Sequence, residues 1–161
     1  MNNNEIIIRP FEESDRKALQ NVLKKEASYT VKHNGGGSEK KKECLCYMYS
    51  DYYFDYEPQN VLVAVHKGTP CGFILGSTDY KLFVSKMKEI YVPKILKNSK
   101  IWGLFHKICV AVNKKQDKKG GVAFHINIDQ NYQGKKIGTR LMAAMAELMA
   151  KAGKKYMYLV T

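Results

Sequence analysis

Residues 132–140 read Tyr132-Gln133-Gly134-Lys135-Lys136-Ile137-Gly138-Thr139-Arg140. They follow a segment of alternating apolar and polar residues, 122–129, and open a segment with helical apolar spacing, 137–152. A helix that begins there presents backbone N–H groups without acceptors and the positive end of its dipole. The glycines allow close approach and the lysines add positive charge. Residues 133–140 are therefore predicted to bind the pyrophosphate of an anionic cofactor.

The spacing of the glycines separates this loop from two common nucleotide-binding motifs. A Walker loop requires G-x-x-x-x-G-K-[ST] and a Rossmann fingerprint requires G-x-G-x-x-G, and neither pattern occurs in the chain. The loop instead resembles motif A of the GNAT acetyltransferase superfamily, [RQ]-x-x-G-x-[GA]. Gln133 and Gly138 match the ends of that motif, and Lys136 stands at its first glycine. A lysine there is tolerated if its φ is helical and is strained if the backbone requires a positive φ.

Three further segments resemble the same superfamily. The run Ile6-Ile7-Ile8-Arg9-Pro10 is similar to its opening strand, and the helix pattern that follows can be capped by Ser14 or Asp15. The apolar runs 61–66 and 71–76, joined by Lys67-Gly68-Thr69-Pro70, predict a hairpin. Residues 77–121 then intervene, with helix-like stretches at 83–96 and 101–112. This insertion resembles a subgroup of bacterial GNAT proteins related to the acetyltransferase-like domain of O-GlcNAcase.

These resemblances imply one fold class. We expect an α/β (α+β) fold with a mixed, mostly antiparallel central sheet flanked by helices, and a helical insertion at about 80–119 between the third and fourth strands. With 161 residues and no internal repeat, the chain is expected to form one domain, 1–161. The superfamily fold continues beyond the strand that follows Gly153. We therefore expect an open sheet edge, which marks a C-terminally short chain or is covered by a second copy in a homodimer.

The resemblance also implies acetyl-CoA, or coenzyme A, as the cofactor. In the superfamily the strand before motif A separates from its neighbour, and its backbone binds the pantetheine. In this chain Phe124, Ile126 and Ile128 share one face of that strand, and His125, Asn127 and Asp129 share the other. We expect the cofactor to contact the backbone of Ile126 and Ile128 and the loop residues Gln133, Gly134, Lys135, Lys136, Ile137, Gly138, Thr139 and Arg140.

Acetyl transfer to an amine requires an oriented thioester, a donor to its carbonyl and a neutral amine. His125 is able to take a proton near neutral pH, and Asn127 or Asp129 to orient it, so His125 and Asn127 are the candidate catalytic residues. A strand histidine is also commonly a hydrogen-bonded structural residue, and that interpretation stays open. The aromatic cluster fits an acceptor pocket, a core or a dimer contact equally well; its members are Tyr47, Tyr49, Tyr52, Tyr53, Phe54 and Tyr56.

The composition of the chain excludes several other classes of function. A net charge of +12 attracts anions in general, but the lysines follow no RNA-binding or helix-turn-helix pattern, so nucleic acid is not an expected partner. The sequence has no apolar run of about 18 residues and no signal-peptide pattern. We therefore expect a cytoplasmic protein that does not associate with a membrane. No metal is expected, because the four cysteines have no metal-ligand spacing; they are Cys44, Cys46, Cys71 and Cys109.

Two functions are compatible with these features. The first is an N-acetyltransferase that moves acetyl from acetyl-CoA directly to a primary amine of a small molecule or a protein. The second is a non-catalytic CoA-binding or structural acetyltransferase-like module, which Lys136 and the short C-terminal part favour.

Overall fold

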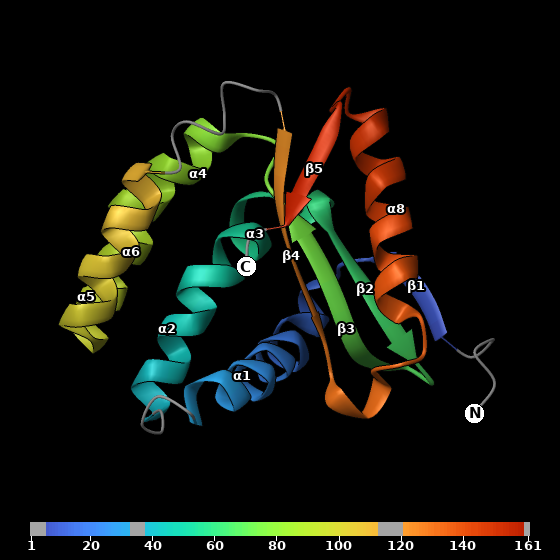
Figure 1. The fold of residues 1–161 in the computed structure, drawn as a ribbon, viewed down its shortest axis with the longest axis horizontal. Helices are drawn as coiled ribbons and strands as arrows, with labels where there is room; N and C mark the ends of the chain where they lie inside the picture. Colours follow the sequence, from blue (N-terminus) through green and yellow to red (C-terminus); the bar gives the residue numbers. More distant parts are fainter. Residues whose placement is uncertain (1–5, 33–37, 113–120, 160–161) are drawn as a thin grey trace.

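Five strands form one open sheet in the order β1-β2-β3-β4-β5, as Figure 1 shows. The structure is a computed structural model that describes residues 6–32, 38–112 and 121–159. Neighbouring strands from β1 to β4 run antiparallel, and β5 runs parallel to β4. Helices flank the sheet, so the predicted fold class is confirmed. The strands are β1 (Ile6–Pro10), β2 (Val61–His66), β3 (Thr69–Gly76), β4 (Gly121–Ile128) and β5 (Tyr156–Leu159).

The predicted hairpin is formed by β2 and β3, with a shorter turn than expected. His66 pairs with Thr69, so only Lys67 and Gly68 occupy the turn. Both have positive φ, at 48° and 78°. Positive φ at both central residues is typical of the type I′ turn, whose twist matches that of the two strands.

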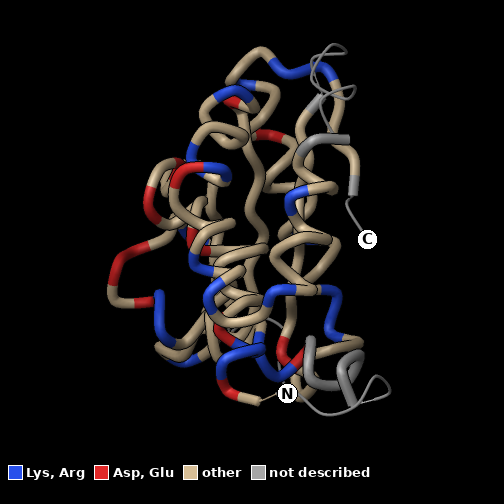
Figure 2. The backbone as a smooth tube through the Cα atoms, turned by 90° about the vertical axis from the view of Figure 1, so that its left-hand side faces the viewer, with Lys and Arg blue, Asp and Glu red and all other residues tan. Residues whose placement is uncertain are grey.

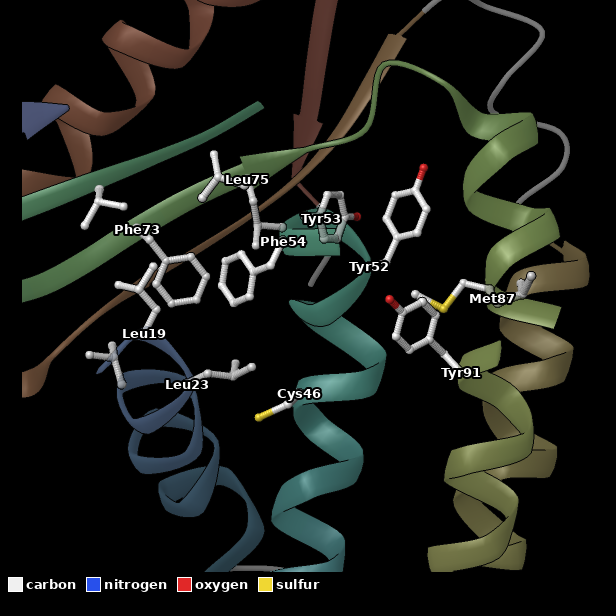
Figure 3. Packing of buried hydrophobic residues seen from close by; sticks show 14 of the residues in the cluster. Leu19, Leu23, Cys46, Tyr52, Tyr53, Phe54, Phe73, Leu75, Met87 and Tyr91 are labelled. Carbon is white, nitrogen blue, oxygen red and sulfur yellow. The ribbon is translucent and has the colours of Figure 1, made fainter. Parts of the chain in front are cut away.

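The two faces of the sheet are covered by different helices (Figure 1). Helix α8 (Ile137–Lys151) covers one face, where Ile74 and Phe124 belong to its apolar cluster. The other face is covered by α1 (Arg16–Lys32), α2 (Glu39–Tyr49) and α3 (Asp51–Tyr56). Figure 3 shows how Phe73 and Leu75 of β3 point toward the residues of those helices. Alternate residues of each strand therefore enter different cores, as the period of a strand requires.

The aromatic cluster of the sequence contributes mainly to this second core. Tyr52, Tyr53 and Phe54 are all buried there, between the sheet and the helical segment that follows β3 (Figure 3). Phe54 stacks on Phe11, with the ring centroids 4.7 Å apart. The sequence left three interpretations open for these residues, an acceptor pocket, a core or a dimer contact, and core packing is the one that the structure supports.

The segment between β3 and β4 contains a helical hairpin that packs on α2. Its elements are α4 (Tyr80–Lys86), the π-helical turn η4 (Met87–Tyr91), α5 (Val92–Asn98) and α6 (Lys100–Val112). Ile95 of α5 is buried against Cys44 and Met48 of α2. Helices α5 and α6 come close at Gly103, where an added Cβ would lie 2.5 Å from the Leu96 side chain. Only glycine fits this crossing.

Two buried carboxylates hold the loops around the sheet. Asp15 accepts two hydrogen bonds from the Arg9 guanidinium, at 2.7 and 2.8 Å, and a third from the Glu12 N–H. Asp15 lies in the 3₁₀ turn η2 (Glu13–Asp15) that leads into α1. Glu57, next to the 3₁₀ turn η3 (Pro58–Asn60), accepts hydrogen bonds from Asn60 and from the backbone of the β3–α4 corner. In the described part of the chain, no helix is both long and apolar enough to cross a bilayer.

Candidate functional site

One edge of β4 is open along half of its length. Ala123 accepts a hydrogen bond from Ser77 N–H, and Asp129 N–H donates to Cys71, so the odd-numbered residues of β4 direct their backbone groups toward β3. Because these directions alternate in an antiparallel pair, the even-numbered residues face the opposite edge. There β5 pairs only with Gly121–Phe124. Within the described ranges no strand lies beside the N–H and C=O groups of Ile126 and Ile128.

The N-terminus of α8 packs against the end of β4, where Gly138 approaches the side chain of Ile128. The first backbone bond of the helix runs from Arg140 N–H to Lys136 C=O, at 3.2 Å. The N–H groups of Ile137, Gly138 and Thr139 therefore have no acceptor within the helix. A Cβ on Gly138 would lie 3.3 Å from the side chain of Ile128. Gly138 thus lets the helix start lie against the end of β4, and its α-carbon faces the strand.

Lys136 has the strained conformation that the sequence left open. It precedes α8 with φ of 58° and ψ of 16°, the left-handed region. A lysine in this conformation lowers the stability of the fold by about 1–2 kcal/mol relative to glycine, which has no Cβ. Gly134 also has a positive φ, at 77°, and has no such cost. The loop keeps the backbone path of a glycine-containing turn although a lysine stands at one of its two left-handed positions.

Several side chains of the loop contact the protein itself. The Lys135 ammonium donates to the Asn131 carbonyl, at 3.1 Å, and lies 4.7 Å from the centre of the Tyr132 ring. The Arg140 guanidinium donates to the carbonyl of Ile6 in β1, at 2.8 Å. Ile137 is buried in the α8 core. Gln133, Gly134, Lys136, Thr139 and Arg140 are exposed, and Lys136 and Thr139 are the two whose side chains have no contact described here.

Glu26 of α1 reaches the same loop, which sequence reasoning missed. Its carboxylate accepts from Gln130 N–H in the 3₁₀ turn η5 (Gln130–Tyr132) and from the Gln133 side-chain amide, each at 3.1 Å. Gln133 also donates to Ile128 C=O, at 3.4 Å. Burial raises the pKa of Glu26, although the hydrogen bond from Gln130 opposes this, and the nearby Asp129 carboxylate adds to the increase. No local pattern predicts a contact between residues so distant in sequence.

His125 and Asn127 lie on the face of β4 opposite to Ile126, as predicted. His125 pairs with Leu75 across the sheet and Asn127 with Phe73, so both point to the side of α1, α2 and α3. The His125 ring packs edge-on against Tyr49 and Tyr53, with centroid distances of 5.4 and 6.4 Å. These two tyrosines are the members of the aromatic cluster that contact a predicted catalytic residue.

The surroundings of His125 keep its imidazole neutral. Burial, and to a smaller extent electrostatic repulsion from His106 of α6, lower the pKa of His125 to about 4. A general base works best when its pKa lies near the working pH. His125 therefore holds a proton weakly at neutral pH, but its neutral ring is still able to accept a hydrogen bond from an amine.

Three of the four cysteines are buried packing residues, and Cys109 of α6 is half-buried. Cys44, Cys46 and Cys71 are buried. Burial raises the pKa of Cys46 to about 12 and that of Cys71 to about 11, so neither is a thiolate at neutral pH. Within the described ranges no group of His, Cys, Asp and Glu side chains is arranged to hold a metal ion.

A sequence model of the Acetyltransferase (GNAT) family matches residues 26–161. The chain belongs to the GNAT acetyltransferase family. The matched range contains the hairpin, β4, the loop before α8 and α8 itself. No curated protein sequence matches the chain.

Solved structures of acetyltransferases share the fold. The structure of SsHAT aligns with a TM-score of 0.73 at 17% identity, over 96% of this chain and 82% of that one. The apo form of the S171A mutant of an agmatine N-acetyltransferase aligns with a TM-score of 0.64 at 20% identity, over 96% and 75% of the two chains. The PaiA N-acetyltransferase of Thermoplasma acidophilum, in complex with coenzyme A, gives 0.61 at 16% identity, over 97% and 79%. At these identities the likeness establishes the fold.

Proposed function

We propose that this protein is an N-acetyltransferase that transfers acetyl directly from acetyl-CoA to a primary amine. The observation that carries the proposal is the contact between the open edge of β4, at Ile126 and Ile128, and the N-terminus of α8. An extended polar chain can bind such an edge through backbone hydrogen bonds. A pyrophosphate can bind the adjoining helix N-terminus. The two surfaces together fit the two parts of coenzyme A.

Each part of the site has a proposed task. The N–H groups of Ile137, Gly138 and Thr139 would hold the pyrophosphate, with the exposed Lys136 ammonium as its counter-charge. The backbone of Ile126 and Ile128 would align the pantetheine, and a strand N–H would polarise the thioester carbonyl. Bound acetyl-CoA supplies the activated acetyl group. His125, Asn127 and Tyr49 would position the acceptor amine from the other face of β4.

The proposed acceptor is a molecule with one primary amine that is otherwise neutral or anionic. A net charge of +12 repels polycations, which disfavours polyamines. An amine acceptor is in keeping with the fold, because one structure that shares it is the polyamine N-acetyltransferase of Drosophila melanogaster, which catalyses the formation of N-acetylagmatine. Four further features expected from the sequence are also proposals. They are membership of the O-GlcNAcase-like subgroup, a cytoplasmic location, a single domain and a homodimer that covers an open sheet edge.

A module that binds coenzyme A without turnover is the second candidate. The strained Lys136 and the low pKa of His125 favour it, because the first weakens the phosphate site and the second removes a base. The two candidates differ in catalysis and share the cofactor site. Binding and turnover must therefore be measured separately.

Calorimetric titration with acetyl-CoA, with ATP as an anion control, tests the cofactor site. We expect saturable binding of acetyl-CoA and no comparable binding of ATP. Lys136→Glu should weaken that binding at least tenfold, because a carboxylate would face the phosphates. Lys67→Glu is the matched control, since Lys67 also has a positive φ but lies in the hairpin turn. Equal affinity of both variants and the parent would contradict the proposed phosphate site.

Release of free thiol from acetyl-CoA, measured across a panel of primary amines, then separates the two candidates. Amine-dependent release at a rate above the chemical background supports the transferase. Tight binding without release for every amine class supports the non-catalytic module.

A further inference from the structure

The outer side of the α5–α6 hairpin carries an exposed apolar stripe. Ile101, Leu104, Phe105 and Ile108 of α6 expose 80, 58, 61 and 54% of their surface. Their spacing of three, four and seven residues places them on one side of the helix. Leu96 of α5 contacts α6 at Gly103, which lies on the opposite side of the helix. We call the four residues Ile101, Leu104, Phe105 and Ile108 the α6 stripe.

The inner side of α6 is already packed. His106 and Val110 are buried, and Trp102 packs on the cluster formed by Cys44, Met48 and Ile95. The helix is thus apolar on both sides, which is typical of a helix that is covered on both sides. The other exposed large apolar residues of the described ranges, Ile7, Leu96, Met142 and Tyr156, are placed singly on four different elements. The exposed apolar residues of the α6 stripe, in contrast, lie next to one another. Contiguous exposed apolar patches of this kind mark interaction surfaces.

The α5–α6 hairpin that carries the stripe has exposed lysines and no acidic residue. Lys97, Lys100 and Lys107 are exposed on the same hairpin. The sequence from Ile90 to Gln116 contains no Asp or Glu. Figure 2 views the molecule from the side on which α5 and α6 lie, and the whole chain carries a net charge of +12. The charge around the stripe is therefore complementary to an anionic partner.

The shape and the charge together favour a lipid surface over a second copy. The hairpin is the layer of the molecule farthest from the sheet, outside α2 (Figure 1). A two-fold dimer through this surface would bring Lys97, Lys100 and Lys107 near their own copies, with no carboxylate on the hairpin to pair with them. A bilayer surface accepts a convex apolar helix, and flanking lysine stems extend to anionic headgroups.

We propose that the α6 stripe docks on the surface of an anionic lipid bilayer, with α6 lying in the plane of the interface. This contact needs one apolar face and no bilayer-crossing helix, so it differs from the membrane-spanning arrangement that the sequence lacks. It differs from the expectation, drawn from the sequence, that no membrane is a partner. It does not depend on the proposed transferase activity.

Co-sedimentation of the full chain with vesicles tests the proposal. The probes are vesicles of phosphatidylcholine alone and of phosphatidylcholine with phosphatidylglycerol. We expect binding to the anionic vesicles at least tenfold stronger than to the neutral ones, and weaker binding at high salt. Trp102 is the single tryptophan of the chain and packs on the inner side of α6, so its unchanged emission would show that this packing is kept when the protein binds.

Two pairs of variants locate the contact. Leu104→Gln with Ile108→Gln should lower the partition coefficient at least tenfold, whereas Ile7→Gln with Met142→Gln, which changes two exposed apolar residues on β1 and α8, should leave it unchanged. Lys97→Gln with Lys107→Gln should weaken binding more than Lys88→Gln with Lys151→Gln, at the same net charge. All eight positions are exposed, and circular dichroism confirms that each variant is folded.

Three outcomes would overturn the proposal. The first is equal binding by the stripe variant and the parent, because general charge alone would then explain it. The second is the absence of binding to anionic vesicles. The third is a dimer in analytical ultracentrifugation that the stripe variant dissociates, because the stripe would then be covered by a second copy.

Discussion

The backbone of Lys136, the residue before the first turn of α8, is strained. Its φ of 58° lies in the left-handed region, where a Cβ costs about 1–2 kcal/mol. Replacement by glycine relieves this cost but increases the entropy of the unfolded chain. Lys136→Gly should therefore raise the free energy of unfolding by about 0.5–1 kcal/mol, as measured by urea denaturation.

Lys67→Gly provides the comparison for that variant. Lys67 has a φ of 48° in the hairpin turn, far from α8 along the chain. Both glycine variants should gain similar stability. If Lys136→Gly lost stability while Lys67→Gly gained it, the Lys136 side chain would stabilise the loop. That result would contradict the backbone strain assigned to Lys136.

His106 makes stability depend on pH. Burial lowers its pKa from 6.5 to about 4 in the folded chain, so the unfolded chain binds more protons between these values. The free energy of unfolding should then fall by roughly 2–3 kcal/mol as the pH is lowered from about 6.5 to about 4. His106→Gln should reduce this slope by about half, because His125 has a similarly lowered pKa; the slope is measured by urea denaturation between pH 4.5 and 7. An unchanged slope would show that protonation of His106 does not cause the pH dependence of stability.

At the scale of elements, Glu57 joins the end of α3 to the β3–α4 corner. One of its carboxylate oxygens accepts from Thr78 N–H at 2.7 Å, from the Thr78 hydroxyl at 2.9 Å and from the Asn60 amide at 3.0 Å. Hydrogen bonds to a buried charged group each contribute more than neutral ones. Glu57→Ala should lower the free energy of unfolding by about 3 kcal/mol in chemical denaturation.

Glu89→Ala is the control for Glu57. The carboxylate of Glu89 is exposed and contacts only Lys86 at 3.2 Å among the contacts described. Its loss should change stability by less than about 0.5 kcal/mol. Similar small losses in both variants would contradict the role given to Glu57.

The contact of α8 with β4 depends on Gly138. An added Cβ would lie 3.3 Å from Ile128 and 3.8 Å from Ile126, so a larger side chain would push the helix from the strand. Gly138→Val should lower the midpoint of thermal unfolding and weaken acetyl-CoA binding together. Lys136→Glu should weaken binding with little change in the midpoint. A Gly138→Val variant with normal midpoint and normal binding would contradict the close packing.

The sequence predicts those parts of the site that depend on local patterns. The alternation of 122–129 places His125 and Ile126 on opposite faces, and the glycines and lysines of 133–138 predict a helix start. Contacts between distant segments were not predictable, as Glu26 on Gln133 and Arg140 on Ile6 show. The neutral state of His125 was missed for the same reason, because its low pKa depends on burial and on His106 of the insertion.

At the scale of the whole molecule, the sheet separates two kinds of surface. On the α8 side the open edge of β4 meets the helix N-terminus, which suits the cofactor. On the other side lies the α5–α6 hairpin. Its inner face brings His106 near His125, and its outer face carries the α6 stripe. The proposed transfer site therefore lies between the cofactor edge and the segment that we propose to meet the lipid surface.

Backbone amide exchange, measured by NMR with and without saturating acetyl-CoA, tests the central claim most directly. The account predicts slower exchange at Ile126, Ile128, Ile137, Gly138 and Thr139, because these N–H groups have no partner in the sheet or the helix. Saturable binding of acetyl-CoA with unchanged exchange at these five amides would contradict it.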